Sequence, residues 1–246
     1  MQTVECEAIV LAAMDYGEAD RIVTLFTREF GKIRGIARNA KKSVKRFGAA
    51  FEIFARLRLR LVLKEGLCTL RNADIITVFP RIRADLAKIG YAGYACEVVD
   101  RYIPEAQYSP RLFRLLSAYL EHLDAFPPCA GDRRFFEVNL LNIVGYRLSL
   151  DRCERCGEGE SSSPAGISRA TTAKPVCDAC GRVWLPVSSD TLSILKKAME
   201  TGRFGVIRFS PTTLHEAGEI LDTAIAEHVN RPLTSLQFLR DVLVVH

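Results

Sequence analysis

Alternation of apolar and polar residues is the clearest pattern in the first 80 residues of the chain. Within Phe51–Leu63, an apolar series alternates with a basic one: Leu57, Leu59, Leu61 and Leu63 against Arg56, Arg58 and Arg60. Successive side chains of a strand point to opposite faces, so the pattern predicts a long strand with a leucine face and an arginine face.

Four other segments in this region are rich in residues that favour strands: 4–13, 21–27, 32–38 and 67–78. Residues 15–20 between the first two are typical of a turn. Five strands with short connections free of helices predict a small closed barrel, most simply an OB-fold, with an SH3-like barrel as the alternative.

From Pro80 the period of the apolar residues changes from 2 to 3.6, which indicates helices. One stripe predicts a helix ending at Pro104: Ile82, Leu86, Ile89, Cys96, Val99 and Ile103. Further helices are predicted to begin at Ser109-Pro110, Asp132, Ser189 or Asp190, Ser210-Pro211 and Ser235. We therefore expect an OB-fold domain at 1–80 and an all-α domain at 81–246, which a cysteine-rich module at 150–186 interrupts.

Two Cys-x-x-Cys pairs define that module: Cys153 with Cys156, and Cys177 with Cys180. This spacing is typical of a zinc site with four thiolate ligands, although two disulfides or redox-active pairs fit the same pattern. Gly157 and Gly181 directly follow the pairs, where a positive φ is often needed. Four thiolates leave no open position on the metal, so the predicted Zn²⁺, one per chain, is structural.

The net charge of +5 is concentrated at the N-terminal end, because residues 1–80 hold fourteen Lys or Arg and nine Asp or Glu. Seven cations lie between Phe30 and Phe51 without an acidic residue: Lys32, Arg34, Arg38, Lys41, Lys42, Lys45 and Arg46. Such a cluster favours phosphate binding, and Arg56, Arg58 and Arg60 extend it if they face the same way. A solvated basic surface is the alternative. Phe47 and Phe51 are candidates for base stacking or for the core.

The sequence lacks the phosphate-loop, zinc-protease and nucleophile-elbow motifs, so we expect a binding protein and no enzyme. Asp15, Glu18 and Asp20 leave a metal-dependent nuclease as an alternative, although a turn explains them more simply. The acidic first residues and the absence of a 20-residue apolar run predict a cytoplasmic protein without a membrane segment.

Several segments together resemble the RecO family of bacterial DNA repair proteins. They are Asp15–Thr27, Gly31-Lys32-Ile33, the basic residues 35–46, the two cysteine pairs and Ser235-Leu236-Gln237-Phe238-Leu239. The resemblance covers nearly the whole chain, and it implies an OB-fold, a helical domain and a zinc module. It matches the family's basic loop to Arg34, Arg38, Lys41, Lys42, Lys45 and Arg46.

For function, the resemblance implies a recombination mediator of the bacterial nucleoid. Such a protein binds single- and double-stranded DNA and anneals complementary strands. With RecR, it helps to load RecA onto strands coated by single-stranded-DNA-binding protein (SSB), whose acidic C-terminal tail docks on the helical domain. No residue motif for RecR or SSB is matched here. An RNA-binding protein of ribosome assembly or translation and a protein-binding adaptor are the other interpretations.

Overall fold

The computed structural model describes residues 3–47, 50–146, 148, 153, 155–157, 164–167, 175–177, 180, 187–229 and 231–244. For residues 44, 45, 164–167, 175–177, 243 and 244 it describes the backbone alone. Contacts between residues divide the chain into two units, Met1–Pro128 with Leu233–His246, and Cys129–Pro232. Among the described helices, none combines the length and apolar character needed to cross a bilayer.

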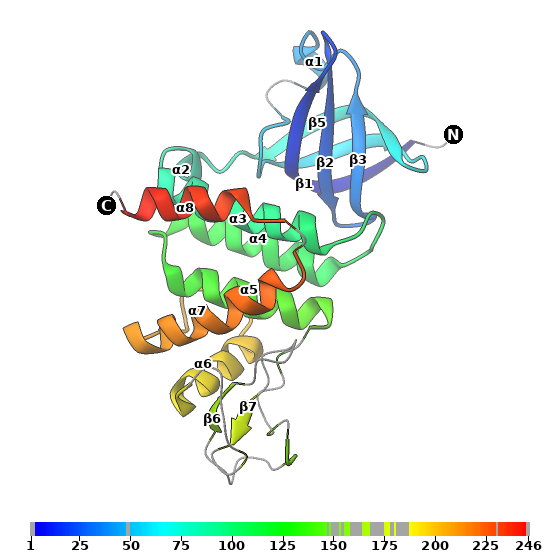
Figure 1. Ribbon diagram of the computed structural model, residues 1–246. Helices are drawn as coiled ribbons and strands as arrows, with labels where there is room; N and C mark the ends of the chain where they lie inside the picture. The colour runs from blue at the N-terminus through cyan, green and yellow to red at the C-terminus, as the bar shows by residue number, and fades with distance from the viewer. Residues whose placement is uncertain are drawn as a thin grey trace. The chain divides into compact units, whose positions relative to one another are not determined.

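A five-stranded closed barrel forms the N-terminal part of the first unit (Figure 1). Its strands are β1 (Thr3–Tyr16), β2 (Asp20–Thr27), β3 (Gly31–Ala37), β4 (Arg56–Val62) and β5 (Leu67–Thr77). They close in the order β1-β2-β3-β5-β4, with β3 and β5 parallel and the other neighbours antiparallel. The predicted OB-type barrel is thereby confirmed.

The leucine face of β4 fills the barrel as predicted, because Leu57, Leu59 and Leu61 are fully buried in its core. Two details of the prediction are wrong. The strand begins only at Arg56, and Leu63 lies beyond its end with an exposed side chain. The connection from β3 to β4 is also not free of helix, because it contains the short helix α1 (Val44–Phe47).

Besides α1, the described part of the first unit contains four helices: α2 (Pro80–Arg83), α3 (Leu86–Tyr102), α4 (Pro110–Ala125) and α8 (Thr234–Val244). The single helix predicted from the stripe at 82–103 is broken, because Asp85 leaves the helical conformation and caps α3 by accepting a hydrogen bond from the Lys88 backbone N. Leu86 therefore falls in the first turn of a new helix and is exposed rather than buried.

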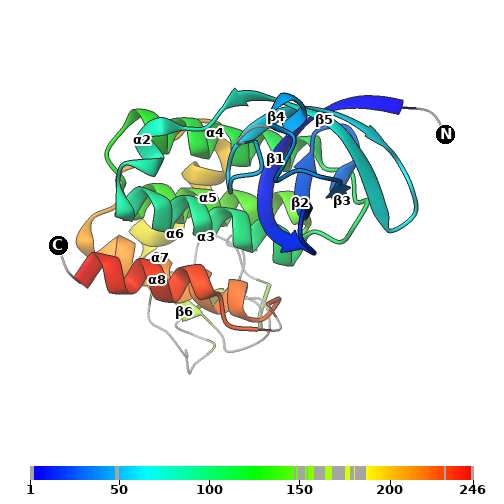
Figure 2. The ribbon, with the colours of Figure 1, turned by 90° about the horizontal axis from the view of Figure 1, so that it is seen from above.

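The terminal helix α8 returns to the first unit and packs along α3 (Figure 2). Gly90 of α3 lies against Leu239, so that a methyl group at Gly90 would collide with that side chain. The carboxylate of Glu97 accepts hydrogen bonds from the backbone N atoms of Thr234 and Ser235 and from Ser235 Oγ. A side chain of α3 thus satisfies the unpaired donors at the start of α8.

The second unit contains α5 (Ala130–Val144), α6 (Ser189–Glu200), α7 (Pro211–Ala226) and a two-stranded sheet of β6 (Pro164–Ile167) and β7 (Pro175–Cys177). Ser210 caps α7 as predicted. Two predicted caps are wrong. Ser188, one residue earlier than expected, caps α6, and Cys129 precedes α5 while Asp132 lies inside its first turn and accepts from the Gly205 backbone N.

Gly31 occupies a position in the first unit that requires glycine for two reasons. Its φ is +69°, and an added Cβ would collide with the backbone carbonyl of Gln107. We expect Gly31→Ala to lower the free energy of unfolding by about 2–4 kcal/mol, from left-handed strain and overpacking together. Urea unfolding at constant m-value measures this loss.

Gly17→Ala is the matched control, because Gly17 has φ +60° but no atom within 4 Å of its would-be Cβ. It should lose only the conformational strain, about 1–2 kcal/mol. Equal losses for the two variants would show that the close approach of Gln107 is unimportant.

Candidate nucleic-acid interface and metal site

A one-residue bulge in β1 determines which of its side chains reach the outside of the barrel. The pairing register with β2 shifts between Val10 and Ala12. Because side chains alternate between faces, the extra residue moves the outward positions from odd to even numbers. Glu7 thus faces outward before the bulge, and Met14 and Tyr16 face outward after it, 57% and 54% exposed.

Cross-strand partners of β1, β2, β3 and β5 form rows on this side of the barrel. Two complete rows are Ala12–Thr24–Arg34–Leu67 and Met14–Ile22–Ile36–Thr69. In the next row Tyr16 lies opposite Asp20. Arg38 and Arg71 directly follow Ala37 and Leu70, the last residues that β3 and β5 pair with each other, and Arg71 lies at a shift in the β4–β5 register. We call these three rows the outer face.

Lys41, an exposed cation of the loop that follows β3, forms an ion pair with Asp15. Four other exposed cations belong to the outer face or to this loop: Arg34, Arg38, Lys42 and Arg71. Within the ranges that the structure describes, none of the four forms an ion pair. Cations without an internal counter-charge can displace the counterions of a phosphate backbone. The sequence predicted Arg34, Arg38 and Lys42 for this role but missed Arg71.

The loop after β3 is tied to the β1–β2 hairpin by its backbone. Asn39 N donates to Asp20 Oδ1 at 2.8 Å, and Lys41 N donates to Ala19 O at 3.0 Å. Arg46 donates to Ser43 Oγ and to Arg38 O, so its guanidinium shapes the loop from within. The side chain of Lys45 lies outside the described residues. Hairpin and loop therefore hold Arg38 and Lys42 in place beside the outer face.

Lys32 lies on the same side of β3 as Arg34, but it is already paired with an acid of α3. Its Nζ lies 3.1 Å from Asp100 Oδ1 and 2.5 Å from the Asp100 carbonyl oxygen of α3, and its side chain is only 13% exposed. Lys32 thus connects β3 of the barrel to helix α3. We leave Lys32 out of the candidate interface for this reason.

The arginine stripe of β4 lies beside acidic residues. Antiparallel pairing with β1 sets Glu5 opposite Arg60 and Glu7 opposite Arg58. Arg60 Nε lies 3.0 Å from Glu5 Oε1, and Arg56 forms ion pairs with both Glu7 and Glu121. Arg58 forms no ion pair among the described residues, but its cross-strand neighbours are Glu7 and Asp74. The stripe therefore lies beside acidic residues, unlike the cations of the outer face.

The two aromatic side chains that flank the basic loop belong to the core. Phe47 and Phe51 are 2% and 4% exposed, and their ring centroids lie 5.2 Å apart. Arg46 lies over the ring of Phe47, 5.0 Å from its centroid. Of the two roles considered for Phe47 and Phe51, the structure supports packing.

The three acids of the β1–β2 turn are not gathered into a metal site. Asp15 accepts hydrogen bonds from Lys41 and Arg21, and these two cations, Lys41 first, hold the pKa of Asp15 below its usual range. Asp20 binds the loop backbone instead. Asp15 and Asp20 therefore act as structural partners, and the described residues of this turn form no metal-binding cluster, which gives no support to the nuclease interpretation.

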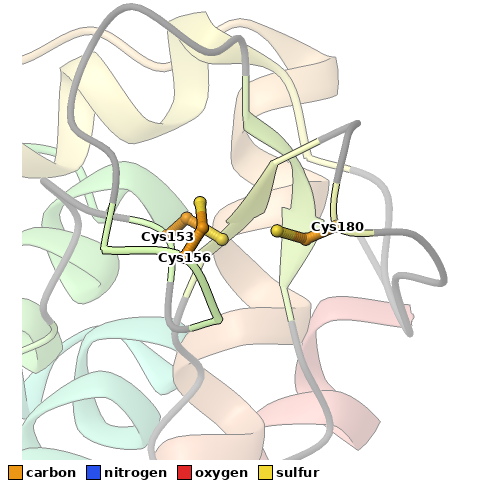
Figure 3. A group of neighbouring side chains, drawn as sticks. All are labelled: Cys153, Cys156 and Cys180. Carbon is orange, nitrogen blue, oxygen red and sulfur yellow. The ribbon is translucent and has the colours of Figure 1, made fainter.

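Three of the four predicted metal ligands come together in the second unit. The Sγ atoms of Cys153, Cys156 and Cys180 lie within 4.8 Å of one another, and Figure 3 shows Cys180 facing the other two across the site. Thiolates bound to one Zn²⁺ would be about 3.8 Å apart, as Zn–S bonds of about 2.3 Å and tetrahedral angles require. The backbone of Cys177 ends β7, but its side chain lies outside the described residues, as does Gly181.

One hydrogen bond shapes the first cysteine pair, and another connects it to the second. Gly157 has φ +73°, as predicted, and its N donates to Cys153 O at 2.9 Å. Arg155 Nη1 reaches the carbonyl oxygen of Cys180 at 2.6 Å. A disulfide joins only two cysteines, so two separate disulfides do not explain a cluster of three thiols. A metal site with several thiolate ligands does explain it. The described cysteines therefore fit a metal ion.

Two comparisons with known proteins cover nearly the whole chain. Models described as "Recombination protein O N terminal" and "Recombination protein O C terminal" match residues 1–79 and 83–237. The DNA repair protein RecO of Geobacter sulfurreducens is 55% identical over 242 residues, 98% of this chain and 99% of the relative. The protein of that name from Geobacter metallireducens is 55% identical over 244 residues, 98% and 99% of the two chains. That from Myxococcus xanthus is 35% identical over 246 residues, again 98% and 99%.

Proposed function

Because the chain belongs to the RecO family of DNA repair proteins, we propose that it is a recombination mediator that binds single- and double-stranded DNA and anneals complementary strands. The observation that carries this proposal is the set of cations around the outer face, Arg34, Arg38, Lys42 and Arg71, which have no ion-pair partner among the described residues. Annealing makes and breaks no covalent bond, so we assign no catalytic residue.

The proposed mechanism is electrostatic. Two strands approach each other slowly because their phosphates repel, and a cationic surface both lowers the repulsion and raises the local strand concentration. Four to six phosphate contacts on the outer face and its loop predict a salt slope of about −3 to −4 for single-stranded DNA. This number counts the four uncompensated cations and, at its upper end, Lys41 and Lys45.

The finer parts of the proposal concern organisation and partners. We propose a nucleic-acid-binding domain at 1–80 and a helical domain at 81–246, interrupted at 150–186 by a module that holds one structural Zn²⁺. The three clustered thiols support the metal, and Cys177 is the proposed fourth ligand. In the bacterial cytoplasm, with no membrane attachment, RecR and the SSB tail are the proposed partners for loading RecA, without assigned contact residues.

Annealing of SSB-coated strands tests the function directly. Complementary oligonucleotides, one with a fluorophore and one with a quencher, are coated with the cognate SSB and mixed with or without the protein. We expect the protein to accelerate quenching, since a mediator must act through the coat. Binding to bare DNA without acceleration would contradict the mediator role, and tighter binding to RNA of the same sequence would favour the ribosomal alternative.

A further inference from the structure

We propose that the outer face binds a single strand of DNA with its bases against Tyr16 and Met14 of β1. Tyr16 is then the residue that makes the protein bind single-stranded DNA in preference to duplex DNA. The inference rests on the proposed DNA-binding function. It adds a base-binding surface that the sequence did not suggest, because the aromatic residues of the basic segment itself, Phe47 and Phe51, are buried.

The first argument is the apolar row on the outer face. Met14, Ile22 and Ile36 are cross-strand partners on three adjacent strands, and Tyr16 follows Met14 on the same side of β1. Met14 and Tyr16 are more than half exposed, and Ile22 and Ile36 are half-buried. Single exposed apolar residues are common on proteins, but a contiguous row across three strands indicates a binding surface.

The second argument is charge, which selects the occupant of this surface. Arg34 is in the row on one side of the apolar row, and Arg38 and Arg71 follow the paired residues on its other side. The strands are about 4.8 Å apart and rise about 3.3 Å per residue, so Tyr16 on β1 lies about 10 Å across the sheet from Arg38 and about 16 Å from Arg34, two rows further along. A ligand with an anionic chain and flat apolar groups along it fits this arrangement, and single-stranded nucleic acid has that chemistry.

The third argument concerns discrimination. An aromatic ring gains energy from an unpaired base because every base offers a π-face, whereas duplex bases are already stacked on one another. Phosphate contacts with Arg34 and Arg38 are open to both kinds of DNA. Selectivity for single strands must therefore come from the apolar row, in which Tyr16 is the aromatic member.

Tyr16→Ala tests the proposal on the full-length protein. Fluorescence anisotropy is measured with a labelled single strand and with the same sequence as a duplex, over a series of salt concentrations. We expect an approximately 10-fold loss of affinity for the single strand, as for other base-stacking residues. Duplex affinity should change less than about twofold, and the salt slope should not change, because no phosphate contact is lost.

Two variants control this experiment. Tyr16→Phe keeps the ring and should retain single-strand affinity. Tyr108→Ala removes another exposed tyrosine of the first unit, one that lies outside the outer face, and should leave both affinities unchanged. Since Tyr16 is more than half exposed, its truncation removes little packing, and an unchanged melting temperature would show that the barrel is intact.

The outcomes separate this inference from the function on which it rests. Equal losses for single strand and duplex, or no loss for either, would overturn it even if the wild-type protein binds DNA. Slower annealing of SSB-coated strands with normal affinity for bare DNA would also overturn it, and would indicate that a protein docks on the apolar row. If the wild-type protein bound neither DNA form, the proposed function itself would fail.

Discussion

Replacing Arg34, Arg38 and Lys42 by glutamine is expected to lower the affinity for single-stranded DNA about 100-fold at about 0.1 M salt. Each phosphate contact contributes about 0.7 to the slope of log K against log salt concentration, so three contacts contribute about 2. Relative to about 1 M salt, where this electrostatic contribution vanishes, that slope corresponds to about two decades in the binding constant at about 0.1 M. The slope itself should become shallower by about 2. Titrations of a labelled oligonucleotide at several salt concentrations measure both quantities.

A second triple variant of equal charge controls for net charge alone. Arg28, Arg58 and Arg60 are exposed arginines on the side of the barrel where Glu5 and Glu7 lie. Changing these three to glutamine removes the same number of charges from a surface where Arg28 and Arg60 form ion pairs and Arg58 lies between Glu7 and Asp74. We expect less than about a threefold loss of affinity, since few phosphate contacts disappear. Equal losses from both triples would show that only the net charge of the barrel matters.

Cys156→Ser is expected to abolish stoichiometric zinc binding and to lower the stability of the second unit by several kcal/mol. Cys156 is exposed, so the substitution removes a ligand but hardly any packing. Metal-binding free energy of a structural site is folding free energy, which explains the expected size of the loss. Metal analysis of the purified protein and thermal unfolding followed by circular dichroism measure the two effects.

Cys129→Ser is the matched control, because Cys129 is also an exposed cysteine of the second unit but lies outside the thiol cluster. It precedes α5 at the N-cap position, where serine is well tolerated, so zinc content and stability should be kept. The strand signal of the barrel should survive in both variants. A metal-free wild-type protein of full stability would contradict a structural metal site.

Periodicity and capping residues predicted much of the fold because both act locally. Leu57, Leu59 and Leu61 fill the barrel as their alternation indicates, and Ser210 begins α7. The break at Asp85 escaped prediction because the apolar stripe continues through it in sequence. The extended backbone of Asp85 and the hydrogen bond that its side chain accepts from Lys88 N show that a new helix begins there.

The candidate interface was harder to predict, because it depends on which strands become neighbours. The cations of β3 and the arginines of β4 look alike in sequence, since both alternate with apolar residues. They differ in their partners: β1 places Glu5 and Glu7 beside β4, whereas Arg34 has Thr24 and Leu67 beside it. Tyr16 escaped notice because its orientation depends on the bulge after Val10.

The return of α8 to the first unit has a consequence for synthesis on the ribosome. Roughly 130 residues separate Tyr102, the end of α3, from Thr234, and translation at about 5–20 residues per second needs on the order of ten seconds to make them. During that interval the groove at Gly90 and the carboxylate of Glu97 lack their partners in α8. The unit that contains the barrel is therefore finished late, and a frameshift or stop codon far downstream would still damage it.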